Sequence, residues 1–174
     1  MTIKRKYFQD ILLYGIIAVY FIILIVLLFF KTSSFRSVNL MPFRFIVDYV
    51  INDGTLAFSN VIGNIFMFVP MGIYLALINN KKTLLGNVTI ILLFSIAAEI
   101  LQYVLKVGTT DIDDVILNGI GGFLGIICYR VLFMVFKEKV YRVIKILSLI
   151  VGGVFILLFT CLHFGVFGFK IRII

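Results

Sequence analysis

The chain has 174 residues, of which 63% are hydrophobic and 14% charged, and its mean hydropathy is +1.20. A soluble domain needs far less apolar material for one core, so this composition excludes an ordinary water-soluble protein and indicates a membrane protein. The net charge of +8 is divided among short segments beside apolar stretches. This distribution argues against a nucleic-acid-binding face, and no nucleic-acid partner is expected.

Five nearly uncharged stretches follow one another, each close to the roughly 20 residues that cross a bilayer as a helix. They span residues 11–30, 61–78, 84–105, 115–136 and 146–168. These stretches lack the strict alternation of barrel strands, and in hydrocarbon only helices and closed barrels satisfy their own backbone. We therefore predict a single all-α, polytopic membrane domain over residues 1–174, with about five transmembrane helices including an additional C-terminal helix at 146–168.

The Lys and Arg residues predict the orientation of these helices, because positive residues are retained on the cytoplasmic side of a membrane. With the N-terminus inside, the larger share of the 16 Lys and Arg residues lies inside, mainly in segments 4–6, 81–82 and 137–145. The chain is therefore predicted to be a multi-pass protein with a cytoplasmic N-terminus. The acidic segment 111–114 then lies outside.

The loop between the first two stretches, residues 31–57, is too long for a tight turn and contains an amphipathic segment. Apolar residues recur at helical spacing from Phe43 to Ile51, and Pro42 suits the first turn of a helix. Residues 52–54 read Asn-Asp-Gly, which ends such a helix. We predict an interfacial helix in this loop, lying on the outer surface of the membrane.

Polar residues gather near the outer ends of the second, third and fourth stretches, where a polar group facing lipid is costly. Residues three or four apart share a helix face, so Asn60 aligns with Asn64, and Glu99 with Gln102. The predicted ligand-binding residues are Asn60, Asn64, Glu99, Gln102, Asp111, Asp113, Asp114 and Asn118. Because they all fall on one side of the membrane, we predict that they line one polar pocket open to the exterior.

The polar residues and the glycines near them also have a purely structural interpretation. Gly121 and Gly125 are typical of a close helix–helix contact, and asparagines beside them of interhelical hydrogen bonds. Acidic residues at a helix N-terminus cap free amides and complement the helix dipole. The Asp-x-Asp-Asp segment offers hard oxygen ligands for Mg²⁺ or Ca²⁺ but lacks a full ligand pattern, so we assign neither a metal nor a cofactor.

Four motifs, in this order, closely resemble those of the VanZ-like family. They are NLMPF at 39–43, N-x-x-x-N-x-x-x-F-x-P-x-G from Asn60 to Gly72, E-x-x-Q at Glu99 and Gln102, and DIDDVILNGIGG at 111–122. The resemblance covers about residues 39–125. It implies a bacterial plasma-membrane protein related to one that lowers susceptibility to teicoplanin-type glycopeptide antibiotics, and it assigns no catalytic residue.

Three functions remain open from the sequence. The first is binding of an amphiphile from among the membrane lipids, either a lipid-linked cell-envelope precursor or a lipoglycopeptide, with Phe43, Phe66 and Phe68 lining its apolar approach. The second is an enzyme acting on a lipid head group, with Glu99 as base and Asp113 or Asp114 as its partner. The third is an assembly or regulatory subunit of a membrane complex. The oligomeric state is not predicted.

Overall fold

The computed structural model of the protein describes residues 3–29, 38–44, 47, 55–79, 83–105 and 110–163. Within these ranges the long helices are α1 (Ile3–Phe29), α3 (Thr55–Ile78), α4 (Leu84–Leu105), α5 (Ile112–Phe136) and α6 (Val140–His163). The short elements are the strands β1 (Val38–Asn39) and β2 (Thr110–Asp111) and the 3-10 helix η1 (Lys137–Lys139). The predicted all-α fold is confirmed, with one long helix at each of the five apolar stretches.

Four apolar stretches of the described residues are long enough to cross a membrane, as expected for an all-α membrane protein. Ile11–Phe29, Phe58–Ile78 and Leu84–Leu105 belong to α1, α3 and α4. The fourth, Ile112–Val154, runs through α5, η1 and the first part of α6. A separate membrane crossing at 146–168 and the cytoplasmic N-terminus therefore stay predictions.

The chain forms two compact units. One unit comprises Met1–Ala18 and Phe136–Ile174. The buried apolar side chains of that unit include Leu13, Ile17, Val140 and Ile144. The other unit, Val19–Val135, contains every residue of the predicted ligand-binding set and is the part of the fold that positions it.

Glycines bring the backbones of α3 and α5 into direct contact. A Cβ atom on Gly121 would meet the backbone carbonyl of Ile65, and one on Gly125 would meet that of Val69. A Cβ atom on Gly72 of α3 would likewise meet the backbone carbonyl of Gly122 on α5. Only a residue without a side chain fits so close to another backbone, so the close contact predicted at Gly121 and Gly125 is confirmed.

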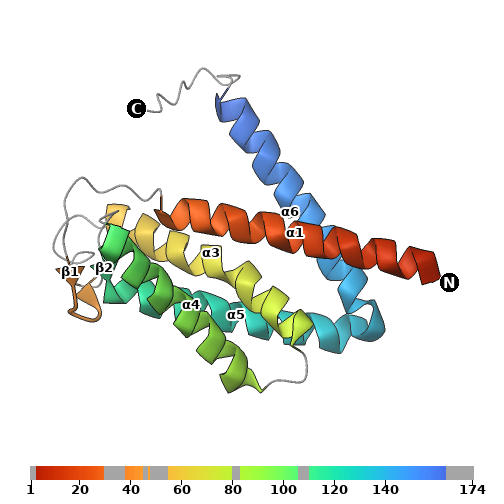
Figure 1. Ribbon diagram of the computed structural model, residues 1–174, viewed down its shortest axis with the longest axis horizontal. Helices are drawn as coiled ribbons and strands as arrows, with labels where there is room; N and C mark the ends of the chain where they lie inside the picture. The colour runs from red at the N-terminus through yellow and green to blue at the C-terminus, as the bar shows by residue number, and fades with distance from the viewer. Residues whose placement is uncertain are drawn as a thin grey trace. The chain divides into compact units, whose positions relative to one another are not determined.

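The adjacent side of α5 packs against α4. The side chain of Leu92 lies over Gly119, and that of Ile91, which is fully buried, lies over Gly122. Figure 1 shows α3, α4 and α5 running side by side within this unit. The glycines of α5 thus hold three helices together and keep their polar ends near one another.

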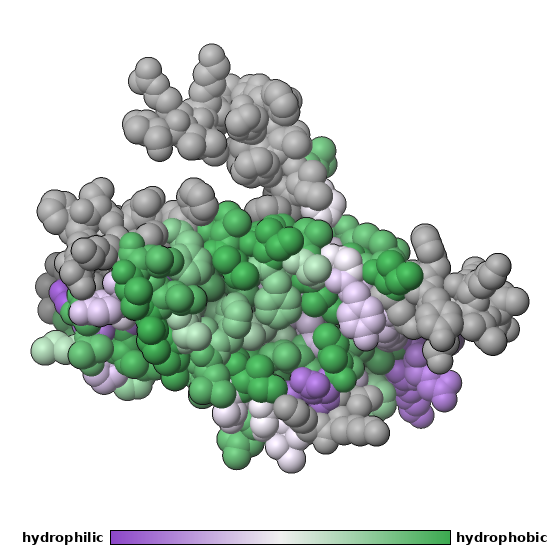
Figure 2. All heavy atoms as spheres, viewed as in Figure 1, coloured by the Kyte–Doolittle hydropathy of each residue, from purple (hydrophilic) through white to green (hydrophobic). Residues whose placement is uncertain are grey.

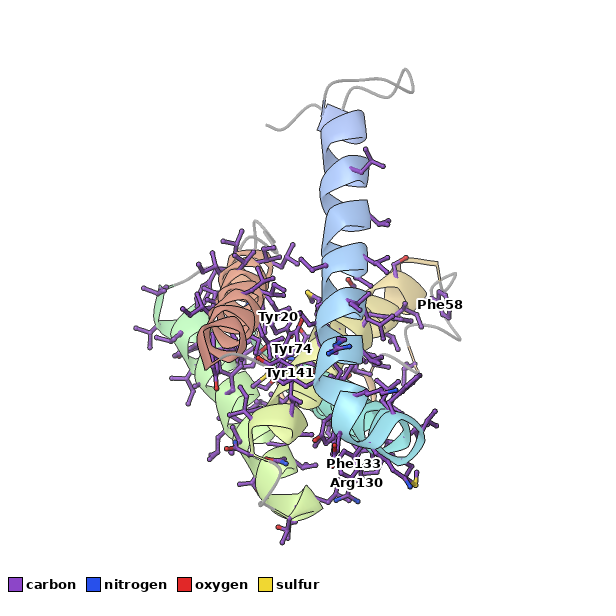
Figure 3. All side chains as sticks on the ribbon, turned by 90° about the vertical axis from the view of Figure 1, so that its right-hand side faces the viewer. Tyr20, Phe58, Tyr74, Arg130, Phe133 and Tyr141 are labelled. Carbon is purple, nitrogen blue, oxygen red and sulfur yellow. The ribbon has the colours of Figure 1, made fainter. Side chains whose placement is uncertain are left out.

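The later part of α1 packs against α3 and α4 through aromatic side chains. The Tyr20 hydroxyl donates a 2.7 Å hydrogen bond to the carbonyl of Met67, and its ring centroid lies 5.4 Å from that of Tyr74 (Figure 3). Phe21 and Phe94 make an edge-to-face contact with centroids 6.1 Å apart. Figure 2 shows mainly hydrophobic side chains on the face that these helices present, which suits a lipid environment.

A two-residue parallel bridge links the first loop to the acidic segment. Val38 pairs with Thr110, and Asn39 pairs with Asp111. Figure 1 shows both strands at the end of the unit where α4 ends and α5 begins. Strands this short have no readable periodicity, so sequence analysis missed them.

The predicted interfacial helix in the first loop falls mostly outside the described residues. Arg44 and Val47 are helical, whereas residues 45–46 and 48–54 are not among those described. The interfacial helix therefore stays a prediction.

Candidate functional site

Asp111 lies at the centre of the polar groups near the bridge. Its backbone N–H donates a hydrogen bond to Glu99 Oε2 at 2.9 Å. Its Oδ1 accepts hydrogen bonds from Asn39 Nδ2 and from the backbone N–H of Asp113, each at 2.9 Å. Side chains from the first loop and α4 therefore meet the start of α5 at one residue.

The NLMPF segment covers the start of α5. The backbone N–H of Phe43 donates a 2.6 Å hydrogen bond to Asp113 Oδ1, and that of Met41 donates to Asn39 Oδ1 at 3.2 Å. Phe43 has a φ of 65°, in the left-handed region that costs a residue with a side chain on the order of 1 kcal/mol or more. The bond to a buried carboxylate helps to offset this strain, which explains why the loop is held so close to α5.

Helix α3 joins this network through Asn64. The side chain of Asn64 is 3% exposed, and its Nδ2 donates a hydrogen bond to Asp114 Oδ1. Asn60 lies one turn earlier and is exposed, and among the described residues no hydrogen bond connects it to the carboxylates. Of the two asparagines predicted on α3, the structure brings only Asn64 to the acidic residues.

We call this network the carboxylate cluster. It comprises Asn39, Asn64, Glu99, Asp111, Asp113 and Asp114. Asn39 and the backbone N–H of Phe43 take part in the network. The predicted ligand-binding set contains neither residue, and Phe43 was predicted only to line the apolar approach with its ring. The signal that could have found them was the NLMPF motif, which the resemblance had singled out but which carries no titratable group.

Gln102 and Asn118 make helix–helix contacts instead. Gln102 Nε2 donates to the carbonyl of Leu28 on α1 at 2.7 Å, and Asn118 Nδ2 donates to Ser95 Oγ on α4 at 2.9 Å. Both side chains are buried, with 5% and 1% exposure. Gln102 Oε1 and Asn118 Oδ1 have no hydrogen-bond partner within the described part of the chain, so each leaves a buried acceptor free. Within the described residues, neither side chain is hydrogen-bonded to the carboxylate cluster.

Two acidic side chains of the cluster are almost fully buried. Glu99 is 6% exposed and Asp113 is 3% exposed. Asp111 lies just outside the apolar stretches, and burial raises its pKa above the ordinary 3.8. The charges of Asp114 and Asp113 raise this pKa further, while hydrogen bonds from the Asp113 backbone and from Asn39 oppose the rise. Asp111 therefore holds a proton more readily than a free aspartate does.

Carboxylates are acceptors, and this determines what the cluster can bind. An ionised carboxylate accepts hydrogen bonds through both of its oxygens and donates none. The cluster therefore suits a ligand rich in donors, such as hydroxyl or ammonium groups. Across the described ranges, no three His, Cys, Asp or Glu residues are grouped so that they could hold a metal ion.

A cavity of about 290 Å³ lies in the same unit, at the opposite ends of α3, α4 and α5. The residues around it include Asn87, Tyr129 and Arg130, and none belongs to the predicted ligand-binding set. The carboxylate cluster is thus identified as a candidate site by the hydrogen bonds among its polar groups and not by a cavity. The predicted pocket at that end stays a prediction.

Comparison with known proteins gives a consistent family assignment. The family model VanZ/LLP1 matches residues 12–137, which is more than half of the chain and includes the whole carboxylate cluster. The curated relative Protein VanZ of Enterococcus faecium is 36% identical over 124 residues, covering 66% of this chain and 71% of that protein. No solved structure shows a significant match. The chain belongs to the VanZ/LLP1 family.

Proposed function

We propose that this chain is a multi-pass protein of the bacterial plasma membrane that recognises the polar head of an amphiphile at its carboxylate cluster. Membership of the VanZ family supports an association with glycopeptide resistance. The ligand we propose is a lipid-linked cell-envelope precursor or a teicoplanin-type lipoglycopeptide. Each of these combines a donor-rich head with an apolar tail.

The observation that carries this proposal is that acidic side chains are buried and also hydrogen-bond different elements of the fold to one another. Glu99 and Asp113 are almost fully buried at the ends of apolar helices, and both are hydrogen-bonded to Asp111 or to its neighbours. Ionisable groups inside membrane segments are costly and are mostly found where they serve a binding or transport task. Simple helix packing does not require acidic side chains that are buried and hydrogen-bonded in this way.

The surroundings of the cluster suit an amphiphile. Phe43 beside the cluster is 52% exposed, and Phe66, on α3 near Asn64, is 67% exposed. The exposed surface of these two rings suits contact with an apolar tail that lies in the membrane. Phe68, which sequence analysis placed in the same approach, is fully buried, so it belongs to the core instead.

The test replaces two carboxylates of the cluster by amides of nearly the same size, which removes their charge. Glu99→Gln retains an oxygen for the N–H of Asp111, and Asp114→Asn retains one for Asn64. The expected result is normal membrane abundance, with teicoplanin susceptibility returning toward that of cells lacking the chain and with less envelope lipid co-purifying. Glu138→Gln, a matched change at an exposed residue outside the cluster, should alter neither. Unaltered susceptibility and lipid retention in both cluster variants would overturn the proposal.

A further inference from the structure

The cavity at the far end of the bundle from the carboxylate cluster has the features of a second, separate binding site. Its lining residues include Asn79 at the end of α3, Asn87 near the start of α4, and Tyr129, Arg130 and Phe133 on α5. Figure 3 shows Arg130 and Phe133 close to one another. Arg130 is 16 residues beyond Asp114 on α5, which at 1.5 Å per residue is about 24 Å along the helix. The two sites therefore cannot share one small ligand.

Asn87 is one of the residues that line this cavity, and it carries a buried acceptor. Its side chain is 3% exposed, and its Oδ1 is buried with no hydrogen-bond partner among the residues described. A buried acceptor without a partner is energetically unfavourable, because its hydrogen bonds to water are not replaced. The helix start itself does not need this oxygen, because Thr83 Oγ1 already accepts a hydrogen bond from Gly86. Once the Asn87 side chain turns toward the cavity, a ligand with a hydroxyl or ammonium donor would satisfy this oxygen.

Arg130 supplies the charge. It is exposed, it lies inside the apolar stretch Ile112–Val154, and no carboxylate is among the residues that line the cavity. An arginine at this depth extends toward the head-group layer, and its guanidinium matches phosphate with paired hydrogen bonds. The rings of Tyr129 and Phe133, stacked with centroids 6.2 Å apart, add an apolar wall beside this charge.

The size of the cavity limits the ligand. Its volume of about 290 Å³ lies at the lower end of the range of roughly 300–1,000 Å³ that is usual for small-molecule sites. A lipid head group fits such a volume, whereas a whole lipid does not. The acyl chains would then remain in the surrounding membrane.

We propose that this cavity binds a phosphate ester that carries a hydroxyl donor, as in the head of phosphatidylglycerol, with the phosphate on Arg130 and the hydroxyl on Asn87 Oδ1. The positive-inside distribution predicts that this end faces the cytoplasm, where such lipids line the inner leaflet. The site is independent of the carboxylate cluster and of the function proposed for it.

The experiment measures lipid retained by the purified full chain in nanodiscs of phosphatidylglycerol mixed with phosphatidylcholine. The intact chain should retain phosphatidylglycerol preferentially. Arg130→Gln and Asn87→Leu should each weaken this retention about 10-fold, the size of effect expected when one charge-assisted or buried hydrogen bond is lost. Lys139→Gln removes the same charge from an exposed residue outside the cavity and should leave retention unchanged.

A second arm distinguishes a lipid from a soluble ester. Glycerol 3-phosphate and inorganic phosphate are added to the chain in nanodiscs of phosphatidylcholine alone, and the unfolding temperature is recorded. Stabilisation by glycerol 3-phosphate that Arg130→Gln abolishes would support the same chemistry with a soluble source. Retention that is equal for both lipids, or that falls as far in Lys139→Gln as in Arg130→Gln, would overturn the proposal. Arg130 is exposed, so the comparison of these two variants does not depend on whether the Asn87 variant folds.

Discussion

The backbone N–H of Asp111 donates a 2.9 Å hydrogen bond to Glu99 Oε2, so the buried carboxylate of α4 holds the strand that precedes α5. Asn39 binds the side chain of the same Asp111, which connects Glu99 indirectly to the NLMPF loop. Glu99 therefore contributes both a charge and an acceptor oxygen, and a substitution by Gln removes only the charge. Substitutions at other positions of the bundle can likewise test the contribution of a charge, of packing or of a hydrogen bond one at a time.

Asn64→Ala removes the donor that Asp114 uses from α3. Because the carboxylate then loses a partner in a partly buried site, the free energy of unfolding should fall by about 1–3 kcal/mol. Asn60→Ala removes an exposed asparagine one turn away and should change this free energy by no more than about 0.5 kcal/mol. Thermal unfolding in detergent measures both, and equal losses would contradict the arrangement described for α3.

Gly125→Ala should destabilise the protein strongly. The added methyl group would meet the backbone carbonyl of Val69 and the Cα of Gly72, so α3 and α5 must separate. Overpacking of this kind costs about 1–3 kcal/mol or more, because neither backbone can move alone.

Gly63→Ala is the matched control for this prediction. A Cβ at Gly63 meets nothing within 4 Å, so the change should be neutral, or stabilising by up to about 1 kcal/mol through helix propensity. Unfolding temperatures of the two variants, measured side by side, provide the comparison. A tolerated alanine at Gly125 would be incompatible with direct backbone contact.

Asp111→Asn should change how stability depends on pH. Burial raises the pKa of Asp111 in the folded chain above 3.8, so the folded state binds this proton more tightly than the unfolded state does. The contribution of protonated Asp111 to the free energy of unfolding is then lost as the pH rises from about 3.8 through the raised pKa of the folded state. Above that pKa the loss is complete. Asparagine keeps an oxygen for Asn39 and Asp113 and has no charge.

The unfolding temperatures of the two proteins should therefore match near pH 3.8 and diverge as the pH rises, with Asp111→Asn the more stable at neutral pH. A pH series of thermal melts checks this. A variant that is less stable than the parent throughout the series would show that the carboxylate charge stabilises the fold.

Gln102→Leu should separate packing from ligand binding. The substitution loses the hydrogen bond to the carbonyl of Leu28 and also removes the buried Oε1 that has no partner among the described residues. These effects oppose one another, so the free energy of unfolding should change by less than about 1.5 kcal/mol. Lipid retention at the carboxylate cluster should not change. Lost retention with an unchanged melting temperature would instead place Gln102 in the binding site.

The amino-acid sequence by itself determined the all-α membrane class, the positions of the five long helices and the close contact at Gly121 and Gly125. These follow from hydropathy and helical periodicity, which act over one or two turns and can be read locally. The motif order also indicated the VanZ family, which the comparisons show.

Only the tertiary structure decided which polar groups meet. Asn39 and Asp111 are 72 residues apart in the chain, and the bond between them depends on a two-residue bridge that has no sequence pattern. Asn60 and Asn64 share the same motif, yet among the described residues only Asn64 is hydrogen-bonded to an acidic side chain. Periodicity predicts which face of a helix a residue occupies. The residue's hydrogen-bond partner, however, depends on how the helices are rotated and spaced, and packing across the whole unit sets this arrangement.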